Sequence, residues 1–235
     1  MWNELSHLST DLGISLPETA PSLFRRYYEL LIYHNKQINL TRITEAQEVM
    51  IKHFLDSLML LVIFPQLSGP LLDLGSGAGL PGIPLKLARP SLELTLLDAL
   101  QKRINFLQQL SENLQLTGVN YLHGRAEDYG QQIAYREKFP LVVSRAVAKL
   151  NVLLELCLPF VAVGGFFVAY KGPEGEKELQ LAEHALLALD GEPVKVWTYD
   201  LPRQFGKRSL LVIRKNSRTS ARYPRKAGLP AKRPL

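Results

Sequence analysis

A short apolar run at 71–74 is followed by four glycines in eight residues, within the stretch LLDLGSGAGLPGIPL. These glycines are Gly75, Gly77, Gly79 and Gly82. The last three spell G-x-G-x-x-G, which indicates a dinucleotide site when a strand precedes it and a helix follows. The first three spell G-x-G-x-G with Asp73 ahead of them, a spacing typical of sites for S-adenosylmethionine (AdoMet). In both cases glycine lets a turn bring bare backbone against a ligand.

Acidic residues help to discriminate between the two ligands. Asp98 ends the next expected strand, where its carboxylate could accept hydrogen bonds from the ribose hydroxyls of either ligand. Asp73 is unfavourable beside a pyrophosphate, but it could pair, directly or through water, with the cationic methionine part of AdoMet. Ala126, Glu127 and Asp128, in GRAEDY after the third strand, are placed where an adenine amino group could be recognised. Asp98 therefore does not discriminate between the two ligands, whereas Asp73 and the segment GRAEDY favour AdoMet.

The elements that must position these residues form three zones: a helical region at 1–68, a strand–helix domain at 69–215 and a basic tail at 216–235. Apolar spacing predicts helices over 22–40, with Ser22 as N-cap, and over 44–64. In the second zone we expect strands at 70–75, 92–98, 119–124, 139–146, 164–172, 194–201 and 207–215, and helices at 82–88, 102–116, 150–161 and 176–189.

This alternation predicts an α/β fold with a mostly parallel sheet and helices on both faces. No helix separates the last two strands, which predicts an antiparallel edge strand pair, a feature common among AdoMet-dependent methyltransferases and unusual in dinucleotide domains.

Charge is distributed unevenly along the chain. The segment 203–235 holds 11 Lys/Arg and no Asp/Glu, which leaves 17 basic and 22 acidic residues in the remainder. Such a run is either a solvated tail or the electrostatic footprint of a phosphate backbone. One cysteine, Cys157, excludes an internal disulfide and suits a reducing cytoplasm. With no apolar run of about 18 residues and no secretory signal, we expect a cytoplasmic chain without a membrane segment.

The residues that the chain lacks limit which kind of atom can accept the methyl group. Methylation of cytosine C5 needs a cysteine nucleophile, and Cys157 lies in an apolar helical run. Methylation of an exocyclic amine commonly uses an Asn/Asp-Pro-Pro-aromatic turn after the fourth strand, and that position reads Ser144-Arg145-Ala146. A ring nitrogen such as guanine N7 already has a free lone pair and needs no general base. Holding that nitrogen close to the methyl group can therefore be enough for catalysis.

Several stretches together carry a resemblance over nearly the whole chain. They are NLT at 39–41, HFLDSL at 53–58, DLGSGAGLPGIPL at 73–85, LLDALQKRINFL at 96–107, GRAED at 124–128, SRAVA at 144–148, YKG at 170–172 and YPRKAGLPAKRPL at 223–235. The sequence resembles the bacterial small-subunit rRNA guanine-N7 methyltransferases, the RsmG or GidB family. Many members of that family end before such a tail, so its presence points to the longer subgroup.

The resemblance implies a Rossmann-like AdoMet-dependent methyltransferase fold behind the helical region, with AdoMet as donor. It implies 16S rRNA as substrate, at a guanosine in the decoding-region loop, and leaves open whether the free RNA or the assembled small ribosomal subunit is used. By motif, AdoMet contacts would fall at Gly75, Leu80, Ala126, Glu127 and Arg145. The physical interpretation adds Asp73, Gly77 and Asp98. No metal site is expected.

Other charged residues are candidates for catalysis or RNA binding. Arg145 could bind the AdoMet carboxylate or orient RNA, and Lys171 could meet a phosphate. His53 and Asp56, three apart on one helix face, could pair, either to fix helix packing or to border the substrate site. The predicted RNA-binding residues are Lys102, Arg103, Lys171, Arg222, Tyr223, Arg225, Lys226, Lys232 and Arg233. The cations of the tail would contact phosphates while Tyr223 stacks on a base.

We expect the tail to order on RNA; the alternative is that it packs back on the domain. Rival functions are a small-molecule or protein methyltransferase, which gives the basic tail no clear use, and an NAD(P) oxidoreductase, which would need a Tyr-x-x-x-Lys pair. A third rival is an RNA-binding ribosome-assembly factor with a vestigial AdoMet fold. The intact acids and glycines of the turn argue against the vestigial fold. The chain is expected to be monomeric.

Overall fold

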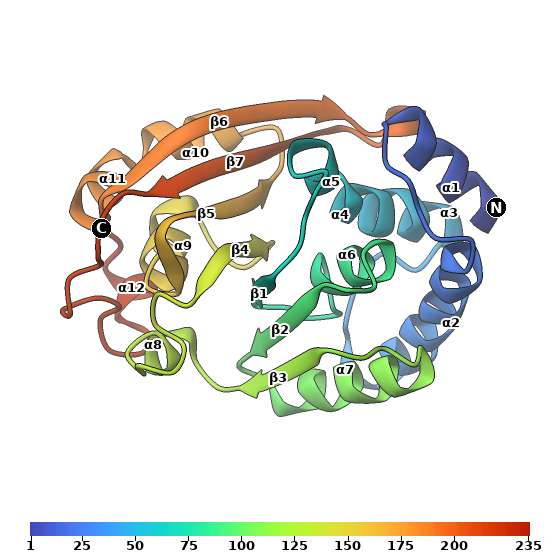
Figure 1. Ribbon diagram of the computed structural model, residues 1–235, viewed down its shortest axis with the longest axis horizontal. Coiled ribbons are helices and arrows are strands. Elements are labelled where there is room, and N and C mark those ends of the chain that lie inside the picture. Colours follow the sequence, from blue (N-terminus) through green and yellow to red (C-terminus); the bar gives the residue numbers. More distant parts are fainter.

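Seven strands form one sheet in the order β3-β2-β1-β4-β5-β7-β6 in a computed structural model that describes residues 1–235 (Figure 1). The strands are β1 (Pro70–Leu74), β2 (Glu93–Asp98), β3 (Val119–His123), β4 (Phe139–Arg145), β5 (Val161–Lys171), β6 (Gly191–Asp200) and β7 (Lys207–Lys215). β1 to β5 pair in parallel, whereas β7 is antiparallel to both of its neighbours, β5 and β6. The predicted mostly parallel sheet with an antiparallel edge strand pair is confirmed.

Helices precede the sheet and cover both of its faces (Figure 1). The N-terminal region contains α1 (Trp2–Asp11), α2 (Ala20–Ile38), α3 (Ala46–Val49), a π-helical segment (Met50–Leu55), α4 (Asp56–Leu58) and α5 (Leu60–Ile63). The later helices are α6 (Gly82–Ala88), α7 (Gln101–Asn113), α8 (Ala126–Tyr129), α9 (Leu150–Cys157), α10 (Gly175–Gln180), α11 (Glu183–Leu189), a 3-10 turn (Pro202–Gln204) and α12 (Leu229–Lys232). None of these helices combines the length and the apolar character that a membrane crossing requires.

Successive strand residues point to opposite faces of the sheet and so divide the core in two. Leu71 packs in the core under α1 to α7, and Leu72 packs in the core under α8 to α12. The N-terminal helices therefore share one continuous apolar layer with α6 and α7. At its centre the ring of Phe54 lies 5.0 Å from that of Phe24 and 4.8 Å from that of Tyr27.

Three predictions of local structure are wrong. The helix expected over 44–64 is interrupted by the π-helical segment, because apolar spacing does not reveal an extra residue in one turn. The helix expected over 176–189 is divided into α10, which packs on β7, and α11, which packs on β6 and α9. Ser22 is not an N-cap: α2 begins at Ala20, and the Ser22 hydroxyl donates to the carbonyl of Thr19.

The turn after β1 is braced from inside the protein by Asp73. Its Oδ2 accepts a hydrogen bond of 2.8 Å from the N–H of Gly82, which fixes the start of α6. Its Oδ1 is buried without a partner. Burial disfavours the carboxylate and raises the pKa of Asp73 from 3.8 to about 7, against the opposing effect of the Gly82 N–H. The carboxyl group thus supports the glycine turn from below.

The C-terminal tail packs back on the domain, which is the alternative arrangement given above; that the tail orders on RNA stays a prediction. The guanidinium of Arg136 donates to the carbonyls of Thr219, Ser220 and Tyr223. Tyr223, predicted to stack on a base, is buried in the core beneath α8 to α12. The backbone carbonyls of the tail therefore bind the guanidinium of Arg136, and the ring of Tyr223 is not available to a ligand.

Arg225, predicted to contact phosphate, forms an ion pair with the buried Glu155 instead. Its Nε donates to Oε1 at 2.8 Å and its Nη2 donates to Oε2 at 2.6 Å. The other tail cations predicted to contact RNA are exposed, and that contact stays a prediction: Arg222, Lys226, Lys232 and Arg233.

Replacing Asp73 by Asn should change how stability depends on pH. Between the unfolded pKa of 3.8 and the folded pKa of about 7, the folded chain holds a proton that the unfolded chain has lost. The free energy of unfolding should therefore decrease as pH rises through this window. In urea unfolding, the free energy of unfolding of the wild type should fall by about 2 to 3 kcal/mol relative to that of Asp73→Asn between pH 5 and pH 8. Parallel pH profiles would contradict this burial effect.

Arg225→Ala should destabilise the chain, whereas Lys226→Ala should not. The first change leaves the carboxylate of Glu155 buried beside only one tail N–H, and the second removes an exposed cation next to it. Loss of one partner of a buried pair predicts a deficit of about 3 kcal/mol in the free energy of unfolding. Thermal melting of both variants checks this expectation, and equal melting temperatures would refute it.

Candidate cofactor and substrate cavity

A cavity of about 1010 Å³ opens at the carboxyl ends of β1, β2, β4 and β5. Its other walls come from the loop after α2, the π-helical segment, the start of α7, α10 and the start of β7. Strand order reverses between β1 and β4, and ligands of open α/β sheets bind at this kind of position. The cavity is therefore the candidate functional site.

Most of the residues predicted for cofactor binding or catalysis are brought together in this cavity. Those that line it are Gly75, Gly77, Leu80, Asp98, Arg145, His53, Asp56 and Lys171. Arg103, which was predicted for RNA binding only, also lines the cavity. Asp73 lies buried behind the turn, and Lys102 is exposed at the start of α7 outside the cavity.

Asp98 fixes the shape of the glycine turn. Its Oδ2 accepts from the N–H of Gly77 at 2.9 Å and from Nη1 of Arg103 at 3.3 Å, and its Oδ1 accepts from the N–H of Leu100 at 2.9 Å. Each carboxylate oxygen has two lone pairs, so acceptor capacity remains for a ligand hydroxyl. Asp98 thus joins β2, the turn and α7 at the cavity wall.

Gly77 presents bare backbone to the cavity. It has φ of +57°, and a Cβ built on it would meet only the carbonyl oxygen of Gly75, at 3.8 Å. Gly75 differs, because a Cβ there would clash with Cγ2 of Val147. The side chain of Val147 thus fills the space beside Gly75, whereas the open space at Gly77 fits a ligand that lies against the backbone, as AdoMet would.

Arg145 is held in a buried network on the opposite wall. Its Nη1 donates to Oδ2 of Asp56 at 3.0 Å and to the carbonyls of Lys52 and His53. The hydroxyl of Tyr199, from β6, donates to Oδ1 of Asp56 at 2.8 Å. The network ties the π-helical segment to the ends of β4 and β6.

The predicted pair between His53 and Asp56 does not form. The π-helical segment ends just before Asp56 and changes the spacing that places residues three apart on one face. His53 instead shares a hydrogen bond of 2.8 Å with the hydroxyl of Thr41. Burial and the charge of Arg145 lower the pKa of His53 to about 3, so its imidazole is neutral at physiological pH.

Lys171, predicted to meet a phosphate, is paired within the protein instead. Its Nζ donates to Oε2 of Glu178 and to the carbonyl of Ala148, both at 2.7 Å. Cys157 is buried outside the cavity, and burial raises the pKa of its thiol well above the ordinary value. The cavity therefore contains neither a thiolate nor an unpaired carboxylate.

Ala126 and Glu127 do not line the main cavity. Oε1 of Glu127 accepts from the N–H of Gly228 in the tail at 2.8 Å. Glu127 belongs to a separate hollow of about 400 Å³, together with Arg222 and Lys226. An adenine contact for these two residues stays a prediction.

Sequence reasoning missed several residues of the cavity wall. These are Arg42, Lys52, Lys149 and Arg208, with Tyr199 behind the wall. Arg42 directly follows the motif NLT, which was a usable signal, whereas nothing local to Arg208 or Tyr199 indicates a site.

Comparison with known proteins places this chain in a family. The family described as "GidB: rRNA small subunit methyltransferase G" matches residues 21–205. The chain is 48% identical over 225 residues to ribosomal RNA small subunit methyltransferase G of Alkaliphilus oremlandii, covering 95% of this chain and 94% of that protein. The protein of that name from Brevibacillus brevis gives the same identity and coverage.

Solved structures show the shared fold. A point mutant of MtNAS superposes with a TM-score of 0.55 at 13% identity, over 92% of this chain and 82% of that chain. The CMeT domain of the citrinin polyketide synthase gives 0.53 at 10% identity, over 68% of this chain and 51% of that chain. The family model matches most of the chain, and the relatives are 48% identical to it over nearly their whole length. The chain therefore belongs to the rRNA small subunit methyltransferase G (GidB) family.

Proposed function

We propose that the chain is an AdoMet-dependent methyltransferase that transfers a methyl group to N7 of a guanosine in 16S rRNA. Family membership supports the reaction class and the ribosomal substrate. The choice of N7 as the methylated atom rests on the observation that the cavity contains no free base or nucleophile. The proposed setting is the cytoplasm, and the proposed acting form is a monomer.

Residues of the cavity fit the donor. The open backbone at Gly77 and the carboxylate of Asp98 would hold its nucleoside part, with Gly75 and Leu80 beside them. Arg145 would attract the carboxylate of its methionine part, because only Nη1 of its guanidinium is engaged within the protein. AdoMet, when bound, supplies an electrophilic methyl group on a sulfonium sulfur.

The charged groups of the cavity do not favour acid–base catalysis. The three carboxylates that line it are each engaged by a cation: Asp56 by Arg145, Asp98 by Arg103 and Glu178 by Lys171. His53 is a weak base because its pKa is about 3. An acceptor that brings its own lone pair, such as guanine N7, needs only to be positioned near the methyl group.

Product analysis tests this proposal. The purified chain should transfer label from radiolabelled AdoMet to small ribosomal subunits or to naked 16S rRNA, and digestion should give 7-methylguanosine. Comparing the two substrates identifies the form that is used. Label in protein or in another nucleoside would overturn the proposal. Intact AdoMet binding without any transfer would favour the assembly-factor alternative.

Gly77→Ala should weaken AdoMet binding through a methyl group placed in the open cradle. Gly69→Ala is the matched control, because Gly69 has φ of +78°, precedes the same strand and has no atom within 4 Å of a built Cβ. Both variants should lose about 1 kcal/mol of stability from the left-handed backbone. Calorimetry should show an increase of about tenfold or more in the Kd of AdoMet for Gly77→Ala only. Equal affinities would mean that the cradle holds no ligand.

A further inference from the structure

The cavity has more positive charge than its own carboxylates neutralise. Seven Lys and Arg side chains line it, against three Asp and Glu side chains. Four of the cations are within 4 Å of a carboxylate: Lys52, Arg103, Arg145 and Lys171. The other three have no such partner: Arg42, Lys149 and Arg208.

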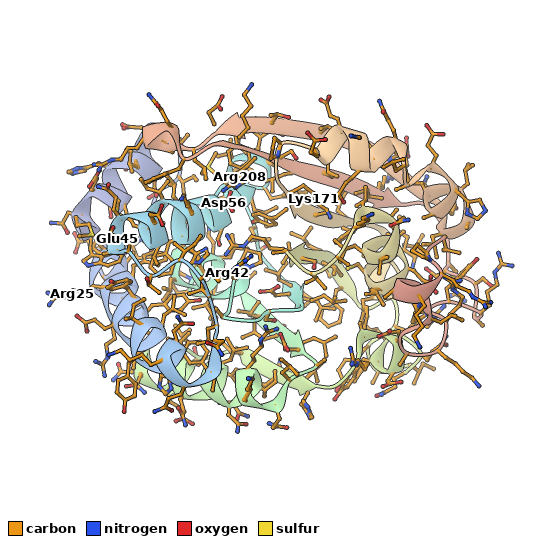
Figure 2. All side chains as sticks on the ribbon, turned by 180° about the vertical axis from the view of Figure 1, so that it is seen from behind. Arg25, Arg42, Glu45, Asp56, Lys171 and Arg208 are labelled. Atoms are coloured by element: carbon orange, nitrogen blue, oxygen red, sulfur yellow. The ribbon has the colours of Figure 1, made fainter.

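The three unpaired cations come from separate parts of the fold that meet at the cavity. Arg42 lies in the loop between α2 and α3, Lys149 directly precedes α9, and Arg208 is the second residue of β7. In the view of Figure 2, Arg208 lies above Asp56 and Arg42 lies below it, and all three residues line the cavity. The charge of Arg208 also helps to lower the pKa of His53, as expected for a cation beside the cavity wall.

The methyl donor does not account for these cations. AdoMet carries a sulfonium, an ammonium and a carboxylate, so its own net charge is positive, and further cations disfavour it electrostatically. The three unpaired side chains instead match a polyanionic acceptor. Enzymes that modify a base take it out of its stack and hold the flanking backbone.

We propose that Arg42, Lys149 and Arg208 bind the phosphates that flank the target nucleotide, whose base enters the cavity between them. This inference rests on the proposed function and deepens it. It assigns the primary RNA contacts to the cavity opening rather than to the C-terminal tail. The paired cations Arg103, Arg145 and Lys171 then neutralise the carboxylates of the cavity wall.

The test compares Arg42→Ala and Arg208→Ala with Arg214→Ala. Arg214 is the control, because it is exposed at the far end of β7, has no carboxylate partner and lies outside the cavity. Each cavity variant should raise the KM for RNA about three- to tenfold, and should reduce the salt slope of RNA binding by about 0.7 for each lost contact with a single-stranded phosphate. The Kd of AdoMet should stay unchanged, and Arg208→Lys should restore most of the RNA affinity.

RNA binding is measured directly by fluorescence anisotropy, so the result does not depend on turnover. Failure of the proposed function would appear as a wrong product from the wild type, whereas failure of this inference would appear as unaltered RNA binding by the variants. KM values and salt slopes equal to those of Arg214→Ala would overturn the inference. It would also be overturned if the cavity variants lost affinity for AdoMet as much as for RNA.

Discussion

The buried ion pair between Arg145 and Asp56 is the interaction on which the architecture of the site depends. Both side chains are largely removed from solvent, so their desolvation must be offset by good geometry and further hydrogen bonds. Tyr199 and the carbonyls of Lys52 and His53 supply those bonds. The pair joins the N-terminal helices to β4 and β6, and so turns a helical layer into one wall of the cavity.

The same principle of internal pairing decides what chemistry the cavity can support. Each lining carboxylate is neutralised by a cation, and His53 is kept neutral by burial and nearby positive charge. A site built this way holds and orients its reactants but offers no strong base. Arg42, Lys149 and Arg208 have no carboxylate partner, and their positive charge suits a methyl acceptor that is itself an anion.

The C-terminal tail shows how charge in sequence and charge at a surface can differ. Its cations are concentrated at one end of the chain, yet Arg225 is used internally by Glu155. Conversely, Arg136 of the domain donates to three tail carbonyls. The unpaired cations at the cavity come from distant parts of the sequence, where no local run marks them.

The sequence by itself determined the alternation of strands and helices, the antiparallel edge strands, the glycine turn after β1 and the position of Asp98 at the end of β2. These features depend on local periodicity and on residue types that a turn requires, and both are written in consecutive residues. Only the tertiary structure decided the partners of Asp56, Glu127, Lys171 and Arg225, and the convergence of the unpaired cations. Those outcomes depend on which side chains packing brings within a few ångströms of each other, across separations in sequence that no local pattern spans.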